Sequence, residues 1–281
     1  DEAAWQRALL TELDTTAARL DSAYEVTSIF FGGGTPSLMP PATAAALIDR
    51  VTQLWPVHPH IEITLEANPT SVEAARFAAF RQAGVNRVSM GIQSLRPDAL
   101  SFLGREHSVS EALAALDVAK NTFNRYSFDL IYARPNQTLS EWETELTEAL
   151  QHVGDHLSLY QLTIEHGTAF HHAYHHKGAF SLPPDDDAAD MFLLTLNLLR
   201  DAGLPAYEVS NHAKPGQESR HNLSYWRGEP YIGVGPGAHG RLFYDAQWHA
   251  TQTLKSPERW LQAVQTNSHG LDICEPLSIK E

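Results

Sequence analysis

The sequence predicts an α/β protein built on a parallel β-sheet, either open or closed toward a barrel. Segments with strand and helix patterns alternate at a spacing of roughly 30 residues, the length of one βα unit. The 281 residues suit about two domains or one large α/β barrel. Hydrophobic residues make up 43% and charged residues 19% of the chain, as in an ordinary globular protein. Repeated βα units place their strands in parallel, which gives the predicted sheet.

The individual elements follow from short apolar runs and from helical periodicity. Strands are predicted at Ser28–Phe31, Ile61–Leu65, Arg87–Met90, Phe128–Tyr132, Leu157–Ile164 and Ala206–Val209. Helices are predicted between them at Ala42–Leu54, Val72–Ala83, Ser110–Thr122, Ser140–Val153 and Asp187–Ala202. A helix over Ala3–Leu20 precedes the first strand, so we expect the strand that normally opens such a repeat to lie upstream of this chain. Beyond about Ser210 we expect mostly loop, with one helix at Pro257–Thr266 in an incomplete second region.

The charge of the chain argues against binding to nucleic acid, and the distribution of its apolar residues argues against a membrane-spanning segment. Lys and Arg number 20 against 34 Asp and Glu, and the net charge of −14 disfavours nucleic acid because binding to phosphates needs a basic surface. No apolar run approaches the roughly 20 residues that span a bilayer. The first residues show no signal peptide, so we expect a cytoplasmic protein, while peripheral contact with a membrane stays open.

Polar residues and glycines occupy the ends of the predicted strands, where parallel α/β folds bind their ligands. In chain order they are Gly32-Gly33-Gly34-Thr35, Glu66, Gln93, Asp129, Tyr160 and Glu208. We expect these strand ends to converge on one rim.

Each of these features also has a purely structural explanation. Gly32-Gly33-Gly34 matches neither the dinucleotide nor the phosphate-loop glycine pattern, and it suits a tight turn as well as a ligand loop. Glu66 lies in a strand that should be buried, where a carboxylate needs a partner or a ligand. Asp129 raises the same question, and Arg87 or Arg105 would be an internal partner for it.

The histidine-rich stretch from His166 to His176 suggests a metal site at first reading. On a helix, His171 and His175, or His172 and His176, would share a face. No carboxylate or cysteine pattern accompanies them. We therefore interpret the stretch as a solvated loop.

The segment from Ser219 to Arg241 combines histidine, tyrosine and tryptophan with a glycine-rich loop. Such residues offer an axial metal ligand and stacking surfaces to a flat ligand. A packed aromatic loop with an internally bonded histidine explains the pattern equally well.

Five motifs follow one another along the chain: Gly32-Gly33-Gly34-Thr35-Pro36-Ser37, Glu62-Ile63-Thr64-Leu65-Glu66-Ala67-Asn68-Pro69, Arg87-Val88-Ser89-Met90-Gly91-Ile92-Gln93-Ser94, Leu103-Gly104-Arg105 and Asp129-Leu130-Ile131-Tyr132. Together they resemble the radical S-adenosylmethionine (SAM) enzymes related to oxygen-independent coproporphyrinogen III oxidase, over about Ser28 to Arg241. His221-Asn222-Leu223-Ser224-Tyr225-Trp226 and Gly233–Gly240 are similar to the HemW branch of that group, which comprises haem chaperones. The resemblance implies a partial (β/α)6 barrel over residues 1–210 and the start of a C-terminal region over 211–281.

The resemblance also implies roles for particular residues. Gly33, Gly34 and Thr35 would hold the methionyl end of SAM, and the rest of SAM would contact Glu66, Gln93, Arg105 and Asp129. Haem would lie against His221, Asn222, Tyr225 and Trp226, with His221 as the ligand of the haem iron. The sequence departs from the family at Ala133-Arg134-Pro135-Asn136-Gln137-Thr138, where relatives usually have Gly-Leu-Pro-Gly-Gln-Thr.

The family's [4Fe–4S] cluster requires a C-x-x-x-C-x-x-C loop, which should precede the first helix. This chain has one cysteine, Cys274, which cannot hold a cluster by itself. We therefore expect the cluster ligands upstream of this chain.

Three functions are compatible with these patterns. The resemblance favours a haem chaperone that binds haem and SAM and delivers haem to acceptor proteins. The alternative is an oxygen-independent coproporphyrinogen III oxidase, which performs a radical oxidative decarboxylation in porphyrin biosynthesis. In the third, the barrel is a binding scaffold without radical chemistry.

Overall fold

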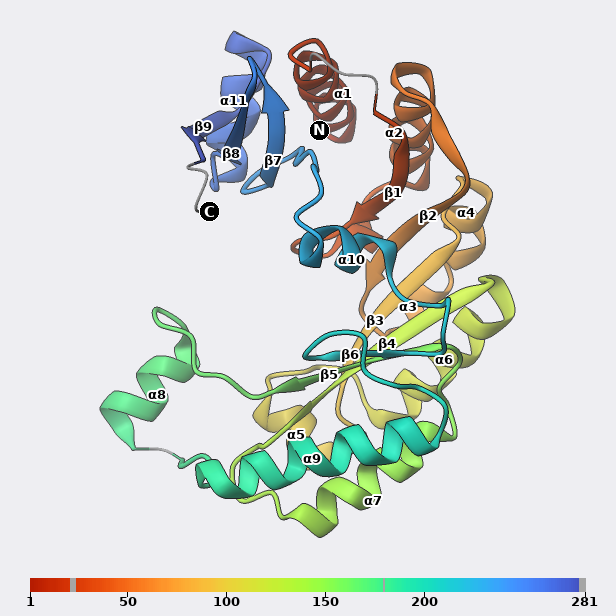
Figure 1. The fold of residues 1–281 in the computed structure, drawn as a ribbon, viewed down its shortest axis with the longest axis vertical. Helices are drawn as coiled ribbons and strands as arrows, with labels where there is room; N and C mark the ends of the chain where they lie inside the picture. The colour runs from red at the N-terminus through yellow and green to blue at the C-terminus, as the bar shows by residue number, and fades with distance from the viewer. Residues whose placement is uncertain (21–23, 179, 278–281) are drawn as a thin grey trace. The chain divides into compact units, whose positions relative to one another are not determined.

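The chain is described by a computed structural model that covers residues 1–20, 24–178 and 180–277, and it confirms the α/β class. Six strands form one sheet in the order β1-β2-β3-β4-β5-β6 (Figure 1). They are β1 (Val26–Phe31), β2 (Val57–Ala67), β3 (Arg87–Gln93), β4 (Arg125–Tyr132), β5 (His156–Gln161) and β6 (Asn211–Ala213). Strands β2 to β5 are parallel to one another, so their carboxyl ends meet at the same edge of the sheet. Strand β6 pairs with β5 in the antiparallel direction, which the βα repeat did not predict.

The chain divides into two compact units that do not follow chain order. The first comprises residues 1–29, 39–63 and 220–281, and the second comprises residues 30–38 and 64–219. The domain boundary expected between residues 210 and 211 stays a prediction.

In the second unit, helices follow the strands as the βα pattern predicts. They are η1 (Pro36–Leu38), α3 (Ser71–Ala74), α4 (Phe77–Gln82), α5 (Pro97–Phe102), α6 (Val109–Thr122), α7 (Leu139–Leu150), α8 (Ala169–Lys177) and α9 (Asp185–Asp201). Complete capping boxes begin α6 at Ser108 and α7 at Thr138. Helices α7 and α9 lie side by side, joined by a 2.8 Å hydrogen bond from Trp142 Nε1 to Thr195 Oγ1 (Figure 1).

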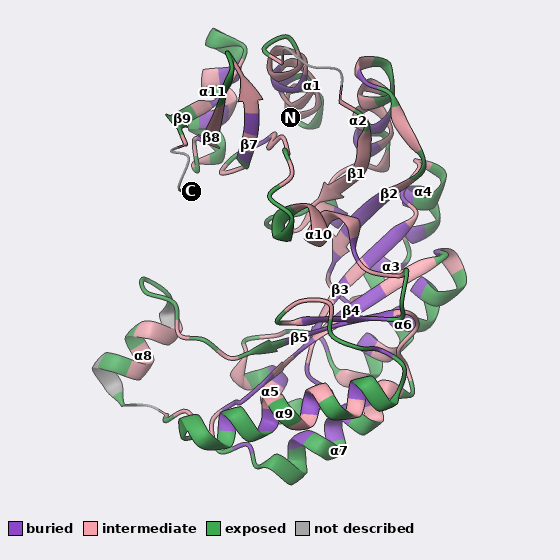
Figure 2. Cartoon of the chain, in the orientation of Figure 1, coloured by how far each residue is buried: buried purple, intermediate pink, exposed green. Residues whose placement is uncertain are grey.

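The two faces of the parallel strands differ sharply in polarity. Register places Met90 beside Phe128 and Leu130 beside Leu159, and these apolar side chains are buried. Buried residues recur along β2, β3 and β4 (Figure 2). On the opposite face, Glu66 pairs with Ser89, and two further polar pairs are Ser89 with Ser127 and Asp129 with Ser158. Parallel sheets are normally apolar on both faces. A polar face therefore indicates a surface for a ligand rather than for core packing.

The first unit contains more structure after residue 210 than the sequence predicts. Besides α1 (Glu2–Ala17) and α2 (Pro41–Leu54), it holds α10 (Arg220–Trp226), α11 (Pro257–Asn267) and a sheet of β7 (His239–Tyr244), β8 (Gln247–Thr253) and β9 (Leu271–Pro276). Its core includes the carboxylate of Glu12, which accepts hydrogen bonds from the Gly235 and Gly270 amides and from Trp260 Nε1. The sequence did not predict these three strands, in which polar and apolar residues are mixed.

Two further expectations about elements are wrong. The strand predicted at Ala206–Val209 is a turn whose Tyr207 amide bonds to the Asn211 carbonyl, and the strand itself is Asn211–Ala213. The single helix predicted over Val72–Ala83 is divided into α3 and α4, because the chain leaves the helical hydrogen-bonding pattern at Ala75 and Arg76. Across the part of the chain that the structure describes, no helix has the length and apolarity to cross a membrane.

Candidate functional site

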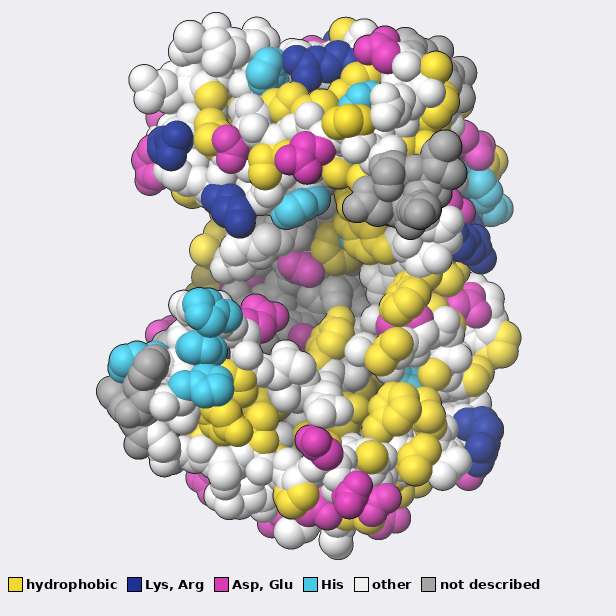
Figure 3. Space-filling model, turned by 60° about the vertical axis from the view of Figure 1, so that its left-hand side comes forward, with side chains coloured by type: hydrophobic (Ala, Val, Ile, Leu, Met, Phe, Trp, Pro, Cys, Tyr) yellow, Lys and Arg dark blue, Asp and Glu magenta, His cyan; other side chains and the backbone are white. Residues whose placement is uncertain are grey.

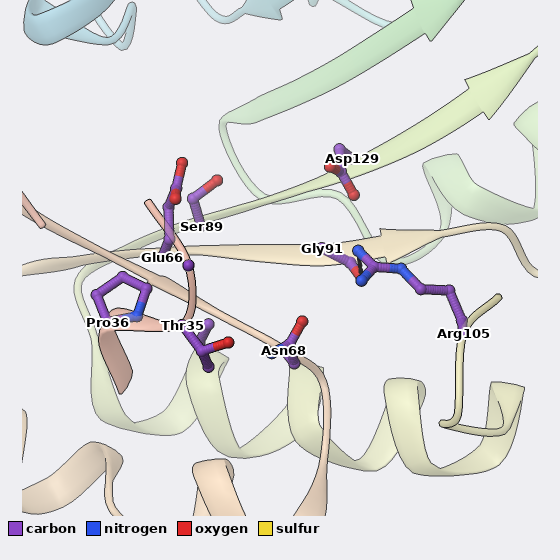
Figure 4. A pocket seen from close by; sticks show the side chains of 10 residues that line it. Thr35, Pro36, Glu66, Asn68, Ser89, Gly91, Arg105 and Asp129 are labelled. Atoms are coloured by element: carbon purple, nitrogen blue, oxygen red, sulfur yellow. Dashed lines mark hydrogen bonds between the residues drawn. The ribbon is translucent and has the colours of Figure 1, made fainter. Parts of the chain in front are cut away.

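A pocket opens at the carboxyl edge of β2, β3 and β4, within the second unit. It is lined by Gly34, Thr35, Pro36, Glu66, Ala67, Asn68, Ser89, Gly91, Arg105 and Asp129 (Figure 4). The loop Gly32-Gly33-Gly34 after β1, called the glycine loop below, forms one wall, and the polar face of the sheet forms another. Its volume of about 210 Å³ is less than the roughly 300 Å³ at which sites for drug-sized ligands begin. The pocket can therefore enclose one part of a larger ligand.

Glu66 stands at the end of β2 and faces the glycine loop. The Gly33 amide donates a hydrogen bond to its carboxylate, and a Cβ on Gly32 would lie 3.2 Å from Glu66 Oε2. Burial raises the pKa of Glu66, and the Gly33 hydrogen bond opposes the shift. A Cβ on Gly32 would also lie 2.8 Å from the Phe30 ring, so a side chain at this position would be crowded by both the ring and the carboxylate.

Asp129 lies opposite, on β4, and its carboxyl group is held from two sides. Oδ1 accepts a hydrogen bond from the Gln93 amide at 3.2 Å, and Arg105 provides a nearby positive charge. Part of the Asp129 surface is exposed to the pocket, yet protein atoms surround the carboxyl group closely. This burial raises its pKa to about 6, against the opposing effect of Arg105. Asp129 therefore titrates near neutral pH, which is typical of functional carboxylates.

Arg105 reaches from the loop after α5 toward β3. Its Nη2 lies 3.4 Å from the Gly91 carbonyl oxygen, and its Nε is buried without a hydrogen-bond partner among the described residues (Figure 4). A buried guanidinium nitrogen without a partner is costly. Arg105 is therefore available to an acidic group of a ligand.

The structure brings together five of the seven residues that the motifs assigned to SAM. Gly34, Thr35, Glu66, Arg105 and Asp129 line the pocket. Gly33 and Gln93 lie behind this lining and act through their backbone amides on Glu66 and Asp129.

Sequence reasoning did not assign five residues of the pocket lining to the site: Pro36, Ala67, Asn68, Ser89 and Gly91. Ser89 and Gly91 alternate along β3 with the buried Val88 and Met90. Alternate residues of a strand face opposite sides of the sheet, and this alternation could have identified Ser89 and Gly91 from the sequence.

The segment assigned to haem lies in the first unit, on α10. The carboxylate of Glu62 accepts the backbone N–H groups of Arg220 and His221 at 3.0 and 3.4 Å and so holds the start of the helix. The His221 and Tyr225 rings meet edge to face at 4.6 Å. Tyr225 and Trp226 are 47% and 60% exposed. Asn222 is partly buried on the same helix.

Large exposed aromatic side chains beside a histidine provide both a metal ligand and apolar contact for a flat macrocycle. The first part of the segment, Arg220–Trp226, is a helix in which no residue is buried, and the haem interpretation and the packed-loop interpretation both stay predictions.

The histidine-rich stretch is also a helix and not the expected loop. Thr168 caps the N-terminus of α8, and Gly178 ends it in the left-handed conformation. The ring centroids of His171 and His175 are 4.4 Å apart, and histidines gather on this part of the surface (Figure 3). No group of three or more potential ligands among the described residues is arranged to hold a metal ion, and the side chain of His176 lies outside those residues.

Comparison with known proteins gives consistent results. Residues 6–149 match the model of the radical SAM superfamily. The chain is 44% identical over 280 residues to the mitochondrial radical S-adenosyl methionine domain-containing protein 1 of Mus musculus, covering 98% of this chain and 63% of that protein. It is 42% identical over 257 residues to the heme chaperone HemW of Escherichia coli, covering 90% of this chain and 66% of that protein. The chain thus spans less than two thirds of the length of these relatives.

Among solved structures, the coproporphyrinogen III oxidase HemN from Escherichia coli has a similar fold. The TM-score is 0.78 at 23% identity, with 97% of this chain and 64% of that chain covered. At this identity the likeness concerns the fold alone, and it confirms the expected partial barrel. The similarity to HemW-type relatives confirms the branch that the motifs indicated.

Proposed function

Because the chain belongs to the radical SAM superfamily, we propose that the pocket at the carboxyl edge of the sheet binds SAM. We further propose that the protein is a haem chaperone of the HemW type. The residues of the pocket support the proposed binding of SAM, and the residues of α10 support the proposed binding of haem.

The side chains of the pocket fit the charges of SAM. SAM carries an ammonium, a sulfonium and one carboxylate, and the pocket offers two carboxylates, Glu66 and Asp129, with one guanidinium, Arg105. Arg105 suits the carboxylate of SAM. Glu66 and Asp129 suit its ammonium group or the ribose hydroxyls. The small volume indicates that one part of SAM is enclosed while the rest follows the polar face of the sheet.

In this family, SAM bound to a reduced [4Fe–4S] cluster is a source of a carbon-centred radical. The residues of this chain do not fit the cluster, because three thiolates are needed and the sequence has only Cys274, on the exposed strand β9. The role of the pocket residues is therefore to bind and orient SAM.

The haem assignment rests on one observation, the exposed aromatic side chains next to His221 on α10. Tyr225 meets the His221 ring on one side and Tyr231 on the other, at 4.6 and 4.7 Å. An imidazole can ligate the haem iron while the aromatic faces cover the macrocycle. Delivery of haem to acceptor proteins is the corresponding role, and it agrees with the name of the Escherichia coli relative, heme chaperone HemW.

Haem titration of the wild-type chain and of His221→Ala tests this assignment. We expect a Soret shift in the wild type, and in the variant an altered spectrum with affinity reduced about tenfold or more through loss of the axial bond. His171→Ala and His175→Ala are matched controls from the other histidine-rich helix and should bind as the wild type does. An unchanged His221→Ala, with loss of binding in the α8 variants, would move the haem site to α8.

The fold of the chain is equally compatible with an oxidase. An anaerobic assay for protoporphyrinogen formed from coproporphyrinogen III separates the two functions when it is made on a protein that also carries the cluster ligands expected upstream. Product formation would favour the oxidase, whereas haem binding that depends on His221, without product, supports the chaperone.

A further inference from the structure

A buried carboxylate outside the pocket joins the two loops that line it. Glu73 lies on α3, is 5% exposed and does not touch the cavity. Its carboxylate accepts hydrogen bonds from the Ser37 hydroxyl and from Asn68, through the backbone amide at 2.7 Å and the side-chain Nδ2 at 3.1 Å. Ser37 directly follows the pocket residues Gly34, Thr35 and Pro36, and Asn68, which also lines the pocket, begins the loop between β2 and α3.

The local sequence explains why the side chain points inward. The Thr70 hydroxyl accepts the Glu73 amide at 3.3 Å and begins α3, which places Glu73 at the third helical position. In a capping box, a glutamate at this position would bond back to the backbone amide of the capping residue. Here its oxygens are instead shared between Ser37 and Asn68. The side chain therefore serves the loops rather than its own helix.

Arg76 strengthens the same junction from the following turn. Its Nη1 donates to the Ser37 carbonyl oxygen at 2.5 Å, and its guanidinium lies 5.5 Å from the centre of the Phe80 ring. Ser37 is fully buried, so both its hydroxyl and its carbonyl have protein partners. The glycine loop is thus fixed at one end by a carboxylate and a guanidinium from the segment that follows β2.

We propose that Glu73 is a positioning residue for SAM, holding the glycine loop and the Asn68 loop at the separation that the ligand requires. This inference rests on the proposed SAM site. Figure 4 shows Thr35 and Pro36 on one side of the pocket and Asn68 on the adjacent side. Two loops fixed before binding lose less conformational freedom when the ligand enters, and affinity rises accordingly. Loss of the junction should weaken binding without removing any atom that touches SAM.

The test compares SAM affinity in the wild type, Glu73→Gln and Glu73→Ala by calorimetric titration, well below the unfolding temperature of each variant. Glu73→Gln keeps the shape but replaces one acceptor by a donor facing Asn68 Nδ2. We expect the Kd for SAM to rise about tenfold, the scale of one lost hydrogen bond to a charged group. The matched control is Glu12→Gln, another buried carboxylate that accepts several hydrogen bonds, in the first unit. It should lower stability and leave the SAM Kd unchanged.

A double-mutant cycle with Ser37→Ala shows whether Glu73 acts through the loop. If it does, Glu73→Gln has a smaller effect on the Kd in the Ser37→Ala background than in the wild type. Hydrogen exchange gives an independent readout, because the Asn68 amide should exchange faster in Glu73→Gln and remain protected in Glu12→Gln.

The outcomes separate this inference from the proposed function. Wild-type binding with an unchanged Kd in Glu73→Gln and Glu73→Ala overturns the positioning role and leaves the SAM site in place. A wild-type chain without SAM binding overturns both.

Discussion

The backbone amide of Gln93 donates a hydrogen bond to Oδ1 of Asp129, at 3.2 Å, across the register shift between β3 and β4. Gln93 makes this bond at a φ of 67°, in the left-handed region where a side chain is unfavourable. Such strain persists where the surroundings hold it in place, and it is concentrated at functional sites. Here it keeps the Asp129 carboxylate in a fixed position at the pocket wall.

Asp129 should make SAM binding depend on pH near neutrality. Its pKa of about 6 means that the carboxylate is largely ionised at pH 7.5 and largely protonated at pH 5.5. If the ionised form contacts a cationic or donor group of SAM, affinity falls as the pH is lowered through 6. Asp129→Asn should bind more weakly at pH 7.5 and lose most of this pH dependence, as measured by calorimetric titration. The exposed Asp117→Asn serves as control, and an equal pH dependence in wild type and Asp129→Asn would contradict the assignment.

The same residue should show a conflict between stability and binding. Because its pKa is higher in the folded state than the usual 3.8, Asp129 favours folding most below pH 3.8, and this contribution is lost as the pH rises through 6. At pH 7.5 the buried charge is a cost to the folded state. Asp129→Asn should therefore raise the free energy of unfolding at pH 7.5, by at most about 3 kcal/mol, the equivalent of a shift of about two pKa units, measured by urea denaturation. A destabilised variant would show that the Gln93 and Arg105 interactions outweigh burial.

Gly91 should be required for SAM binding because it leaves room for the Arg105 guanidinium. A Cβ on Gly91 would lie 2.9 Å from Arg105 Nη2, which must then move away. The end of an arginine side chain moves easily, so Gly91→Ala should change stability by less than about 1 kcal/mol, within the range of mild substitutions. SAM affinity should fall several-fold, because the guanidinium is displaced. In the Arg105→Ala background, Gly91→Ala should have no further effect; an undiminished effect there would place its cause elsewhere.

Much of the sheet and part of the site could be predicted from the sequence. Strands β2 to β5 carry apolar residues at alternate positions, and carboxylates such as Glu66 and Asp129 in these strands are rare enough to indicate a ligand. Ser89 and Asn68 could not be identified in this way, because small polar residues occur on many structural surfaces. Gln93 was assigned through the family resemblance, yet its contribution is a backbone amide at an unusual φ, which residue type does not reveal.

Elements held by distant partners were also beyond sequence reasoning. The start of α10 depends on the Glu62 carboxylate from β2, 158 residues earlier in the chain. The strands β7 to β9 pair with one another, and the Glu12 carboxylate bonds to the Gly235 and Gly270 amides in the segments that precede β7 and β9. Ala133 and Asn136, where relatives usually have glycine, both adopt positive φ values of 55° and 61°. The loop geometry is therefore retained without glycine, at a cost that is smaller for asparagine.

This chain should not assemble an iron–sulfur cluster. Anaerobic reconstitution with iron and sulfide should leave no stoichiometric four-iron absorbance, because one cysteine cannot replace three thiolates. Cys274→Ser should give the same spectrum as the wild type. A stoichiometric cluster in either protein would contradict the expectation.

Two buried histidines, His156 at the start of β5 and His212 on β6, should make the second unit sensitive to acid. His156 and His212 are 3% and 1% exposed, and burial lowers the pKa of both, that of His212 to about 4. Arg87 and Arg125 further disfavour a charge on His156, whose Nε2 instead lies 2.8 Å from the Tyr207 hydroxyl.

The direction in which stability changes with pH follows from the number of protons that the folded and the unfolded chain bind. Between pH 6.5 and 4 the unfolded chain binds a proton at His212 that the folded chain does not, so stability falls as the pH is lowered through this window. A shift of this size corresponds to a loss of about 2 kcal/mol between pH 7 and pH 5 from His212 alone. Asp129 acts in the opposite direction, so the comparison has to be made between variants rather than between pH values in one protein. His212→Gln should lower stability at pH 7 but flatten the decline toward pH 5 in urea denaturation. The exposed His60→Gln should keep the wild-type slope, and a wild-type slope in His212→Gln would show that the acid sensitivity arises from other groups.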